Sequence, residues 1–211
     1  MNIFGKSRLW VTSFEDAHTA FLDAILRVWP SCRATCQATT GEDEITRKLV
    51  VFIRKDKKIR SSPFFVESQL ELLPPDLRGD VTAKGYLDIA VLFFTTSRKV
   101  YFACECKRLH IPDGHGTRRS LATEYVLQGM MRFVRAQYAK SFPLGAMIGY
   151  VMDGDIVSAT SAVVTQVRKY SRRLHCRSRD IGSGTPPAAL TTMHRRACGD
   201  IRLTHLLVPF Q

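Results

Sequence analysis

The stretch that decides the fold runs from residue 85 to residue 109 and reads G-Y-L-D-I-A-V-L-F-F-T-T-S-R-K-V-Y-F-A-C-E-C-K-R-L. Two apolar runs flank the turn-forming letters T-T-S-R-K, and this pattern predicts two adjacent β-strands. Successive side chains of a strand point to opposite faces, so Glu105 and Lys107 share one face of the second strand. Asp88 lies at the start of the first strand, between two apolar residues. The sequence therefore predicts two acids and one lysine close together on an otherwise apolar sheet.

Regular elements are predicted on both sides of these strands. In chain order they are helices over residues 13–29 and from residue 39 or 40 to about 54, a strand over residues 63–73, a helix over residues 118–140, a strand over residues 146–152, a helix capped by Asp155 and a strand over residues 201–210. Pro30 is expected to end the first helix. Residues 176–199, rich in Ser, Gly, Pro and Arg, predict a mobile loop. No repeat or domain boundary interrupts the order, so a single α/β domain over residues 1–211 is expected.

Basic residues outnumber acidic ones across the chain. Lys and Arg number 31 against 19 Asp and Glu, which gives a formal net charge of +12. Such a charge favours a polyanionic partner, because each neutralised phosphate releases counterions. A basic surface that only keeps the protein soluble is the alternative. No basic amphipathic helix with an aromatic face indicates binding to an anionic membrane.

The cysteines and the N-terminal sequence predict a cytoplasmic protein. None of the six cysteines forms a C-x-x-C motif, and Cys104 and Cys106 lie two apart in a predicted strand, where side chains rarely bridge. We therefore expect reduced thiols. The N-terminus lacks the apolar run of a signal peptide, and the longest apolar run, residues 89–94, is far shorter than the roughly 20 residues that a membrane helix needs.

Asp88 and Glu105 suit a hard divalent cation. Each carboxylate enters a strand that otherwise predicts buried core, and a buried carboxylate needs a partner. A cation held between the two acids satisfies both. Mg²⁺, which binds through one or two carboxylates together with substrate phosphate, fits this arrangement best. The structural alternative is a salt bridge between Glu105 and Lys107.

These residues resemble the PD-(D/E)xK nuclease superfamily. The resemblance covers roughly residues 40–155 and comprises Glu44 in the second predicted helix, Asp88 and the E-C-K of residues 105–107 on the two strands, and Gln128 in the helix that follows. It implies a restriction-endonuclease-like core in the order α-β-β-β-α-β, with a mixed central sheet flanked by helices.

The resemblance also implies a role for each residue. The ligands of Mg²⁺, or of Mn²⁺ as a substitute, are Asp88, Glu105 and the main-chain carbonyl of Cys106. Lys107 orients or deprotonates the attacking water and steadies the charge that develops on phosphorus. Glu44 completes the metal site or holds a ligating water, and Gln128 orients the lysine, the water or a phosphate. The arginines expected near phosphates are Arg118, Arg119, Arg132 and Arg135.

Two positions depart from the superfamily pattern. Leu87 stands where a proline precedes the strand aspartate, and Arg132 stands where some branches have a tyrosine. Helix capping is the structural alternative for Glu44, although this residue lies beside the apolar stripe of the predicted helix and could point over the sheet edge. A loop with His110, His115 and Asp113 forms a second candidate set that turn chemistry explains as well. His205, in the last predicted strand, is expected to be a hydrogen-bonded core residue.

The function expected from the resemblance is Mg²⁺-dependent hydrolysis of phosphodiester bonds, with DNA as the partner. Two alternatives remain open. One is a non-catalytic nucleic-acid-binding module that keeps the fold and the charge, and the other is a cleavage subunit of a larger defence or mobile-element assembly. A homodimer or a partner subunit is compatible with these functions.

Overall fold

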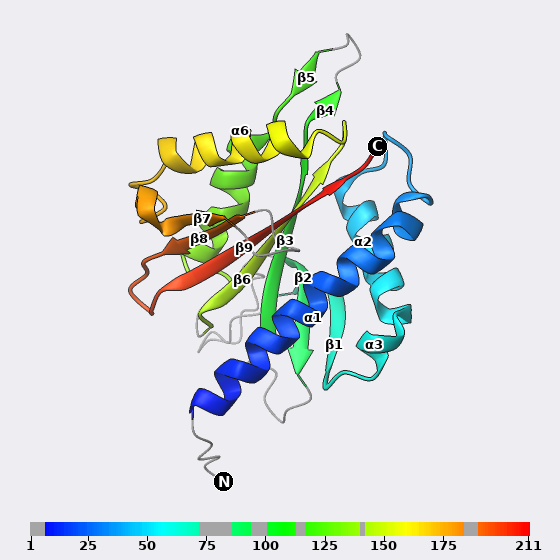
Figure 1. The fold of residues 1–211 in the computed structure, drawn as a ribbon, viewed down its shortest axis with the longest axis horizontal. Helices are drawn as coiled ribbons and strands as arrows, with labels where there is room; N and C mark the ends of the chain where they lie inside the picture. The colour runs from blue at the N-terminus through cyan, green and yellow to red at the C-terminus, as the bar shows by residue number, and fades with distance from the viewer. Residues whose placement is uncertain (1–6, 72–85, 94–100, 113–116, 140–141, 184–189) are drawn as a thin grey trace, which may run out of the picture.

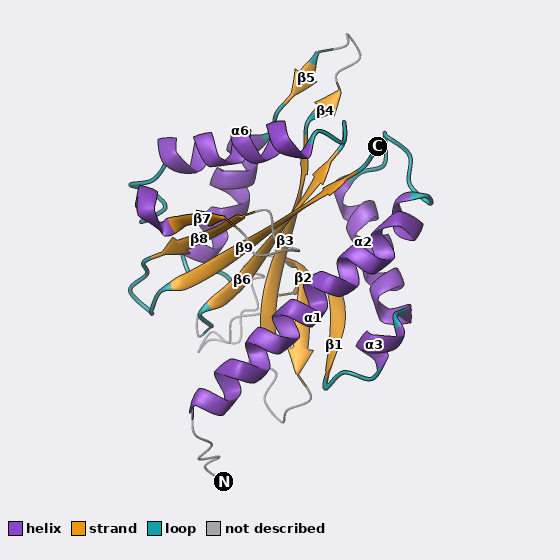
Figure 2. Ribbon diagram, in the orientation of Figure 1, coloured by secondary structure: helices purple, strands orange, loops and turns teal. Residues whose placement is uncertain are grey.

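Helices pack on both faces of a seven-stranded mixed sheet (Figures 1 and 2). The computed structural model describes residues 7–71, 86–93, 101–112, 117–139, 142–183 and 190–211. The strands of this sheet are β1 (Phe64–Glu71), β2 (Tyr86–Phe93), β3 (Tyr101–Leu109), β6 (Leu144–Val151), β7 (Ile181–Ser183), β8 (Leu190–His194) and β9 (Ile201–Pro209). A separate hairpin pairs β4 (Ile111–Pro112) with β5 (Arg118–Arg119). The turn predicted at residues 95–99, and His115 with Asp113, lie outside the described residues.

The helices lie before β1, between β5 and β6, and between β6 and β7. They are α1 (Ser7–Arg33), α2 (Glu42–Lys55), α3 (Lys57–Arg60), α4 (Ala122–Glu124), the π-helix η1 (Tyr125–Met130), α5 (Met131–Val134), α6 (Ile156–Lys169) and the 3₁₀-helix η2 (Ser178–Asp180). The consecutive helices α4, η1 and α5 form one helical stretch, called the η1 segment below. From α2 to β6 the main elements follow the predicted order of helix, three strands, helix and strand, and the mixed α/β class is confirmed. None of the described helices is both long and apolar enough to span a membrane.

The sheet combines an antiparallel half with a parallel centre. Strands β1, β2 and β3 form an antiparallel meander. Parallel pairing then joins β3 to β6 and β6 to β9, and β8 and β7 continue the sheet in antiparallel fashion. The sheet order is therefore β1-β2-β3-β6-β9-β8-β7, which places β3 next to the centre.

Side chains of β3 alternate between two apolar cores, as its sequence predicts. Cys104 and Cys106 face the core formed with α1 and α2, where Phe21 and Leu49 are fully buried. Ala103 faces the opposite core, formed with the η1 segment and α6. Glu105 and Lys107 belong to this second face by the same alternation. All six cysteines are free thiols, in agreement with the prediction.

The first helix is longer than predicted. α1 continues through Pro30 to Arg33. The proline nitrogen cannot donate a hydrogen bond, but the Ala34 N–H still donates to the Pro30 carbonyl at 3.2 Å, so the last turn closes. Pro30 therefore lies inside the last turn of α1 and does not end it.

Two other predicted segments differ from the structure. The helix expected over residues 118–140 is shorter, because Arg118 and Arg119 form β5 and the η1 segment ends at Val134. Residues 176–199, expected as a loop, contain η2, β7 and β8. In β8 the side chains of Thr192 and His194 are buried and bonded to each other at 2.7 Å. The polar side chains of β8 have hydrogen-bond partners inside the fold, so they can be buried in a strand. The polar composition of this segment therefore did not indicate a strand.

Candidate active site

The candidate site lies where β2 and β3 separate. The ladder between these strands ends at the pair Ile89–Cys104, whereas β2 stays paired with β1 as far as Tyr86. Asp88 is the next residue of β2 beyond the ladder. Its Oδ2 accepts a hydrogen bond of 2.7 Å from the Cys106 N–H, so a carboxylate takes the place of a main-chain carbonyl on the edge of β3.

Glu42 accepts a hydrogen bond from the next main-chain N–H on this edge of β3. It is the first residue of α2, and its Oε2 accepts a hydrogen bond of 2.7 Å from the Arg108 N–H. Its Oε1 accepts from the Lys107 ammonium at 2.8 Å. The separation of the two strands is therefore lined by carboxylates from two different elements, β2 and α2.

The ammonium of Lys107 sits among three oxygen atoms. Glu42 Oε1 lies 2.8 Å from Nζ, the Cys106 carbonyl oxygen 2.9 Å and Glu105 Oε1 3.0 Å. The lysine side chain is only 14% exposed. Three oxygens around one buried cation form the kind of hard donor set that also suits a metal ion.

Glu105 has no solvent exposure and lies between two cations. Its Oε2 accepts a hydrogen bond of 3.1 Å from Arg132 on α5. Its Oε1 lies at ion-pair distance from Lys107, but no donor among the described residues meets it with hydrogen-bond geometry. This leaves a buried carboxylate oxygen one hydrogen bond short, a condition that a bound cation relieves.

Burial first, and neighbouring carboxylates second, raise the pKa values of the two acids. Burial and the nearby charge of Asp88 raise the pKa of Glu105 to about 7. Burial also raises the pKa of Asp88, against the opposing effect of Lys107. A carboxyl pair with raised pKa values in one place is typical of functional sites, because folding alone gains nothing from the repulsion.

The pKa of Lys107 is raised as well, which for a lysine favours the charged form. Burial works against its charge, but the carboxylates of Glu105, Glu42 and Asp88 outweigh burial and raise the lysine pKa well above its ordinary value. The ammonium is therefore a permanent cation at neutral pH. Of the two roles that the resemblance implies for Lys107, this favours orienting water and stabilising charge over deprotonating water.

Glu44 is not brought to this cluster. Its side chain is 51% exposed and forms an ion pair of 2.8 Å with Lys48, one turn further along α2. Successive helix residues turn by about 100°, so side chains at positions 42 and 44 point about 200° apart. The sequence shows a run of acids at this helix start, but only the docking of α2 on β3 selects Glu42.

Gln128 lies on the η1 segment and is exposed, and its side chain makes no hydrogen bond to any described residue. Its neighbour Gly129 is the residue in contact with the site. A Cβ added at Gly129 would lie only 2.6 Å from Met147 Cε, and in ordinary contact with Glu105 Cγ at 3.5 Å and Lys107 Cγ at 3.6 Å. The η1 segment therefore covers the site closely because it has no side chain at this point.

The four predicted arginines have different environments. Arg118 is tied to Asp153 at 2.8 Å and also contacts Asp155 and Ser158 at the start of α6. Arg119 and Arg135 are exposed, as is the Arg118 side chain despite its ion pairs. Only Arg132 reaches the site, where it binds Glu105 and also donates to the Tyr138 hydroxyl.

Tyr138 and Glu42 are site residues that the sequence did not suggest. The Tyr138 hydroxyl donates to the main-chain carbonyl of Tyr86 on β2, and it accepts from Arg132. Arg132 and Tyr138 thus tie Glu105 on β3 to β2 across the separation of the strands. No spacing in the sequence signals these contacts, because the tie joins segments far apart in the chain.

The donor set fits a divalent cation by its chemistry. Among the described residues no group of three or more His, Cys, Asp and Glu side chains is placed to hold a metal. The candidate ligands are instead two carboxylates, Asp88 and Glu105, and the carbonyl of Cys106. All three donors are oxygens, and the buried Glu105 Oε1 lacks a hydrogen bond, so the residues present suit Mg²⁺ or Mn²⁺.

Comparison with known proteins adds no relative. No protein-family model, no curated protein and no solved structure matches the chain. The membership suggested by the sequence motif therefore stays a prediction that depends on the residues and contacts described above.

Proposed function

We propose that the protein is a metal-dependent nuclease that hydrolyses phosphodiester bonds in DNA. The single observation that carries the proposal is the meeting of Asp88, Glu105, the Cys106 carbonyl and Lys107 where β2 and β3 separate. The order of elements from α2 to β6 supports a restriction-endonuclease-like core for this region. The net charge of +12 supports a polyanionic substrate.

The metal site proposed here consists of Asp88, Glu105 and the Cys106 carbonyl, with Mg²⁺ as the metal and Mn²⁺ as its substitute. Such an ion supplies charge neutralisation for the phosphate and a more acidic bound water. In the structure Lys107 donates to the Cys106 carbonyl that this site requires. A metal held there would compete with Lys107 for this carbonyl, and the ammonium would then be free to donate to the substrate.

Three side chains of the protein have further roles in the proposed reaction. Lys107 keeps its proton at Nζ and donates hydrogen bonds to a phosphate oxygen, where negative charge builds up as the bond breaks. Glu42 holds the ammonium on the β3 edge. Arg132 fixes the orientation of Glu105 through Oε2. Each of these contacts positions a charged group before substrate arrives, and such positioning is a large source of catalytic power.

A second candidate function is the non-catalytic nucleic-acid-binding module. One observation favours it: Lys107 and Arg132 already pair with Glu105, so the cluster is held together by internal ion pairs. In that case the ion pairs of the site would serve the fold, and the exposed arginines would bind nucleic acid without cleaving it.

Cleavage assays separate the two functions. The protein is incubated with plasmid, linear duplex and single-stranded DNA, and with RNA, in Mg²⁺ or in EDTA. We expect metal-dependent cleavage of DNA that falls by at least about 100-fold in both Asp88→Asn and Lys107→Ala, because each removes a group that contacts the reacting phosphate or its metal. Glu67→Gln is the matched control. Glu67 is an acid of β1 that pairs with Arg54 and is not part of the candidate site.

Salt-sensitive binding of DNA without cleavage under any metal condition would contradict the nuclease and favour the module. Cleavage that survives in EDTA, or that persists in Asp88→Asn, would contradict the metal site. Thermal unfolding of each variant establishes that a loss of cleavage does not follow from a loss of fold.

A further inference from the structure

Residues 156–199 carry an excess of positive charge, as the shorter segment of residues 47–60 also does. Residues 156–199 contain eight Lys and Arg and a single acid, Asp180. This stretch comprises α6, the turns that follow it, η2, β7 and β8. In Figure 1 it lies to one side of the sheet, where the orange turn connects α6 to β7.

Most of these cations are exposed and unpaired. We call the following side chains the basic surface: Arg168, Lys169, Arg172, Arg173, Arg177 and Arg195. Within the described residues only Arg195 has an acidic neighbour, Asp180 at 3.6 Å, and no carboxylate lies within ion-pair distance of the other five. Elsewhere in the fold arginines such as Arg27, Arg118 and Arg132 are paired with acids. The basic surface is thus a place where positive charge stays available to a ligand.

Helix electrostatics explain only part of this surface. Arg168 and Lys169 lie in the last turn of α6, where cations interact favourably with the helix dipole. Arg172, Arg173 and Arg177 lie beyond the end of the helix, so this explanation does not reach them. Their accumulation at one place has a cost in mutual repulsion that an anionic ligand removes.

The basic surface is held in place by buried contacts. Lys169 Nζ lies 5.4 Å and Arg173 Cζ 6.0 Å from the centre of the Tyr170 ring, so one aromatic side chain positions two cations. Leu174 is fully buried, and its carbonyl accepts a hydrogen bond of 2.8 Å from His194 on β8. The turn that carries the arginines is therefore anchored to the sheet.

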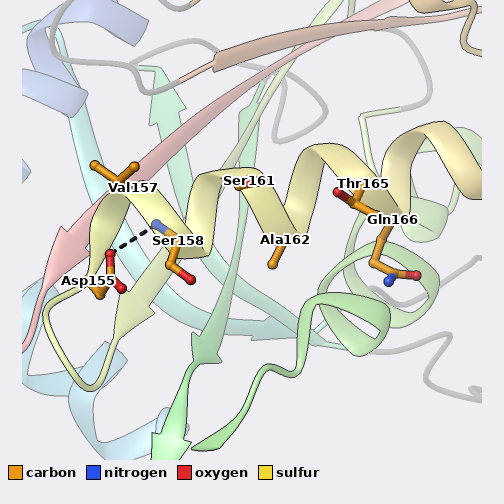
Figure 3. Close-up of a pocket in the computed structure, with 7 residues that line it drawn as sticks. All are labelled: Asp155, Val157, Ser158, Ser161, Ala162, Thr165 and Gln166. Carbon is orange, nitrogen blue, oxygen red and sulfur yellow. Dashed lines mark hydrogen bonds between the residues drawn. The ribbon is translucent and has the colours of Figure 1, made fainter.

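The basic surface and the candidate site lie on the same side of the sheet. α6 packs against α4 and η1, and both helices belong to the core that Ala103 of β3 faces. A shallow pocket on α6 is lined by Ser161 and Thr165, whose hydroxyls are further donors for phosphate, and at the start of the helix by the carboxylate of Asp155 (Figure 3).

From these contacts we propose that the basic surface binds the phosphate backbone of duplex DNA and holds it for cleavage at the candidate site. This inference rests on the proposed function for its substrate. Arginine side chains contribute most of the binding through phosphate contacts that do not depend on base sequence. The predicted phosphate contact of Arg118 is replaced by this surface, because Asp153 and Asp155 already occupy Arg118.

Binding is measured by fluorescence anisotropy of a labelled DNA duplex in EDTA, so that no cleavage takes place. The test variant is Arg168→Glu with Arg172→Glu and Arg173→Glu. The control has the same change in net charge on α3, an exposed basic segment outside the basic surface: Lys57→Glu with Lys58→Glu and Arg60→Glu. Thermal unfolding confirms that both triple variants are folded.

We expect the test variant to bind at least about 10-fold more weakly. Its plot of log affinity against log salt is expected to be less steep by about 0.9 for each phosphate that the variant no longer neutralises. The control variant is expected to stay much closer to the wild type. Equal weakening in both variants would overturn the inference, because net charge alone would then explain binding. Stronger binding to phosphatidylserine vesicles than to duplex DNA would overturn it as well.

The outcome is separable from that of the proposed function. If the wild type cleaves DNA but the test variant binds normally, only the basic surface is refuted. If the wild type binds DNA through this surface but never cleaves it with Mg²⁺, the nuclease is refuted and the surface stands.

Discussion

Asp88 and Glu105 repel each other in the folded protein, and the repulsion is measurable at Glu105. Burial and Asp88 raise the pKa of Glu105 to about 7. We predict that Asp88→Asn lowers this pKa towards its ordinary value, because the variant removes one source of the shift and leaves Lys107 and Arg132, which act in the lowering direction. A pH titration of the Glu105 side-chain carboxyl carbon by NMR measures the change.

The raised pKa of Glu105 also makes the stability of the protein depend on pH. Glu105 binds its proton more tightly in the folded protein than in the unfolded chain, so its contribution to stability is full at low pH and is lost as pH rises through about 7. This loss is expected to be smaller in Asp88→Asn. A Glu105 pKa that is the same in the wild type and in Asp88→Asn would show that the two carboxylates do not interact.

At the residue scale, strand alternation was sufficient to place Glu105 and Lys107 on one face. It was not sufficient to choose between Glu42 and Glu44, because both suit the start of a helix and only the angle between α2 and β3 decides which one meets Lys107. The partnership of Arg132 with Glu105 was hidden for the same reason. Ion pairs between elements depend on docking, which no local pattern encodes.

At the scale of elements, a buried chain of hydrogen bonds joins η1 to β9 and β8. The Tyr125 hydroxyl contacts His205 Nδ1 at 3.0 Å, His205 Nε2 contacts the Thr192 hydroxyl at 2.9 Å, and that hydroxyl contacts His194 Nε2 at 2.7 Å. His194 Nδ1 must donate to the Leu174 carbonyl, since a carbonyl only accepts. With both histidines neutral, every donor in the chain then has one acceptor: Thr192 donates to His194, His205 to Thr192, and Tyr125 to His205.

This chain predicts a loss of stability in acid. Burial lowers the pKa of His205 to about 3 and that of His194 to about 4. The unfolded chain therefore binds more protons than the folded protein below about pH 6.5, so the free energy of unfolding falls as pH drops. The expected loss is about 2 kcal/mol for each histidine at about pH 5.

Urea unfolding over a series of pH values tests this prediction. The variant His205→Gln cannot titrate at this position, so its stability is expected to be lower than that of the wild type near neutral pH and to approach it in acid. A constant difference between the two proteins at every pH would mean that His205 is not held neutral by the fold. The prediction that His205 is a bonded core residue is confirmed by its contacts.

Elements with a clear apolar period were predictable, and those without one were not. β2, β3, β6 and β9 follow apolar runs in the sequence, and α6 begins after Asp155 as expected. The hairpin of β4 and β5 is only two residues long on each side, too short for any period. The strands β7 and β8 were not predictable, because β8 buries polar side chains whose hydrogen bonds form only in the complete sheet.

At the scale of the whole molecule, the order of elements was predictable but the assembly of the sheet was not. The parallel pairs of β3 with β6 and of β6 with β9 join segments far apart in the chain. Likewise, a net charge of +12 predicts a polyanionic partner without showing where it binds. The place where this partner binds can be proposed only from the structure, which shows which arginines form ion pairs with acids and which are exposed on the basic surface.

The claim on which the proposed function depends is that the separation of β2 and β3 holds a divalent metal. The most direct measurement is a titration with Mn²⁺ followed by electron paramagnetic resonance, at a pH above about 7, where Glu105 is ionised. We predict that the wild type and the control Glu67→Gln bind Mn²⁺ equally, and that Asp88→Asn binds it at least about 10-fold more weakly, since it lacks one carboxylate ligand. Equal binding of Mn²⁺ by the wild type and Asp88→Asn, or no binding by the wild type, would contradict the account.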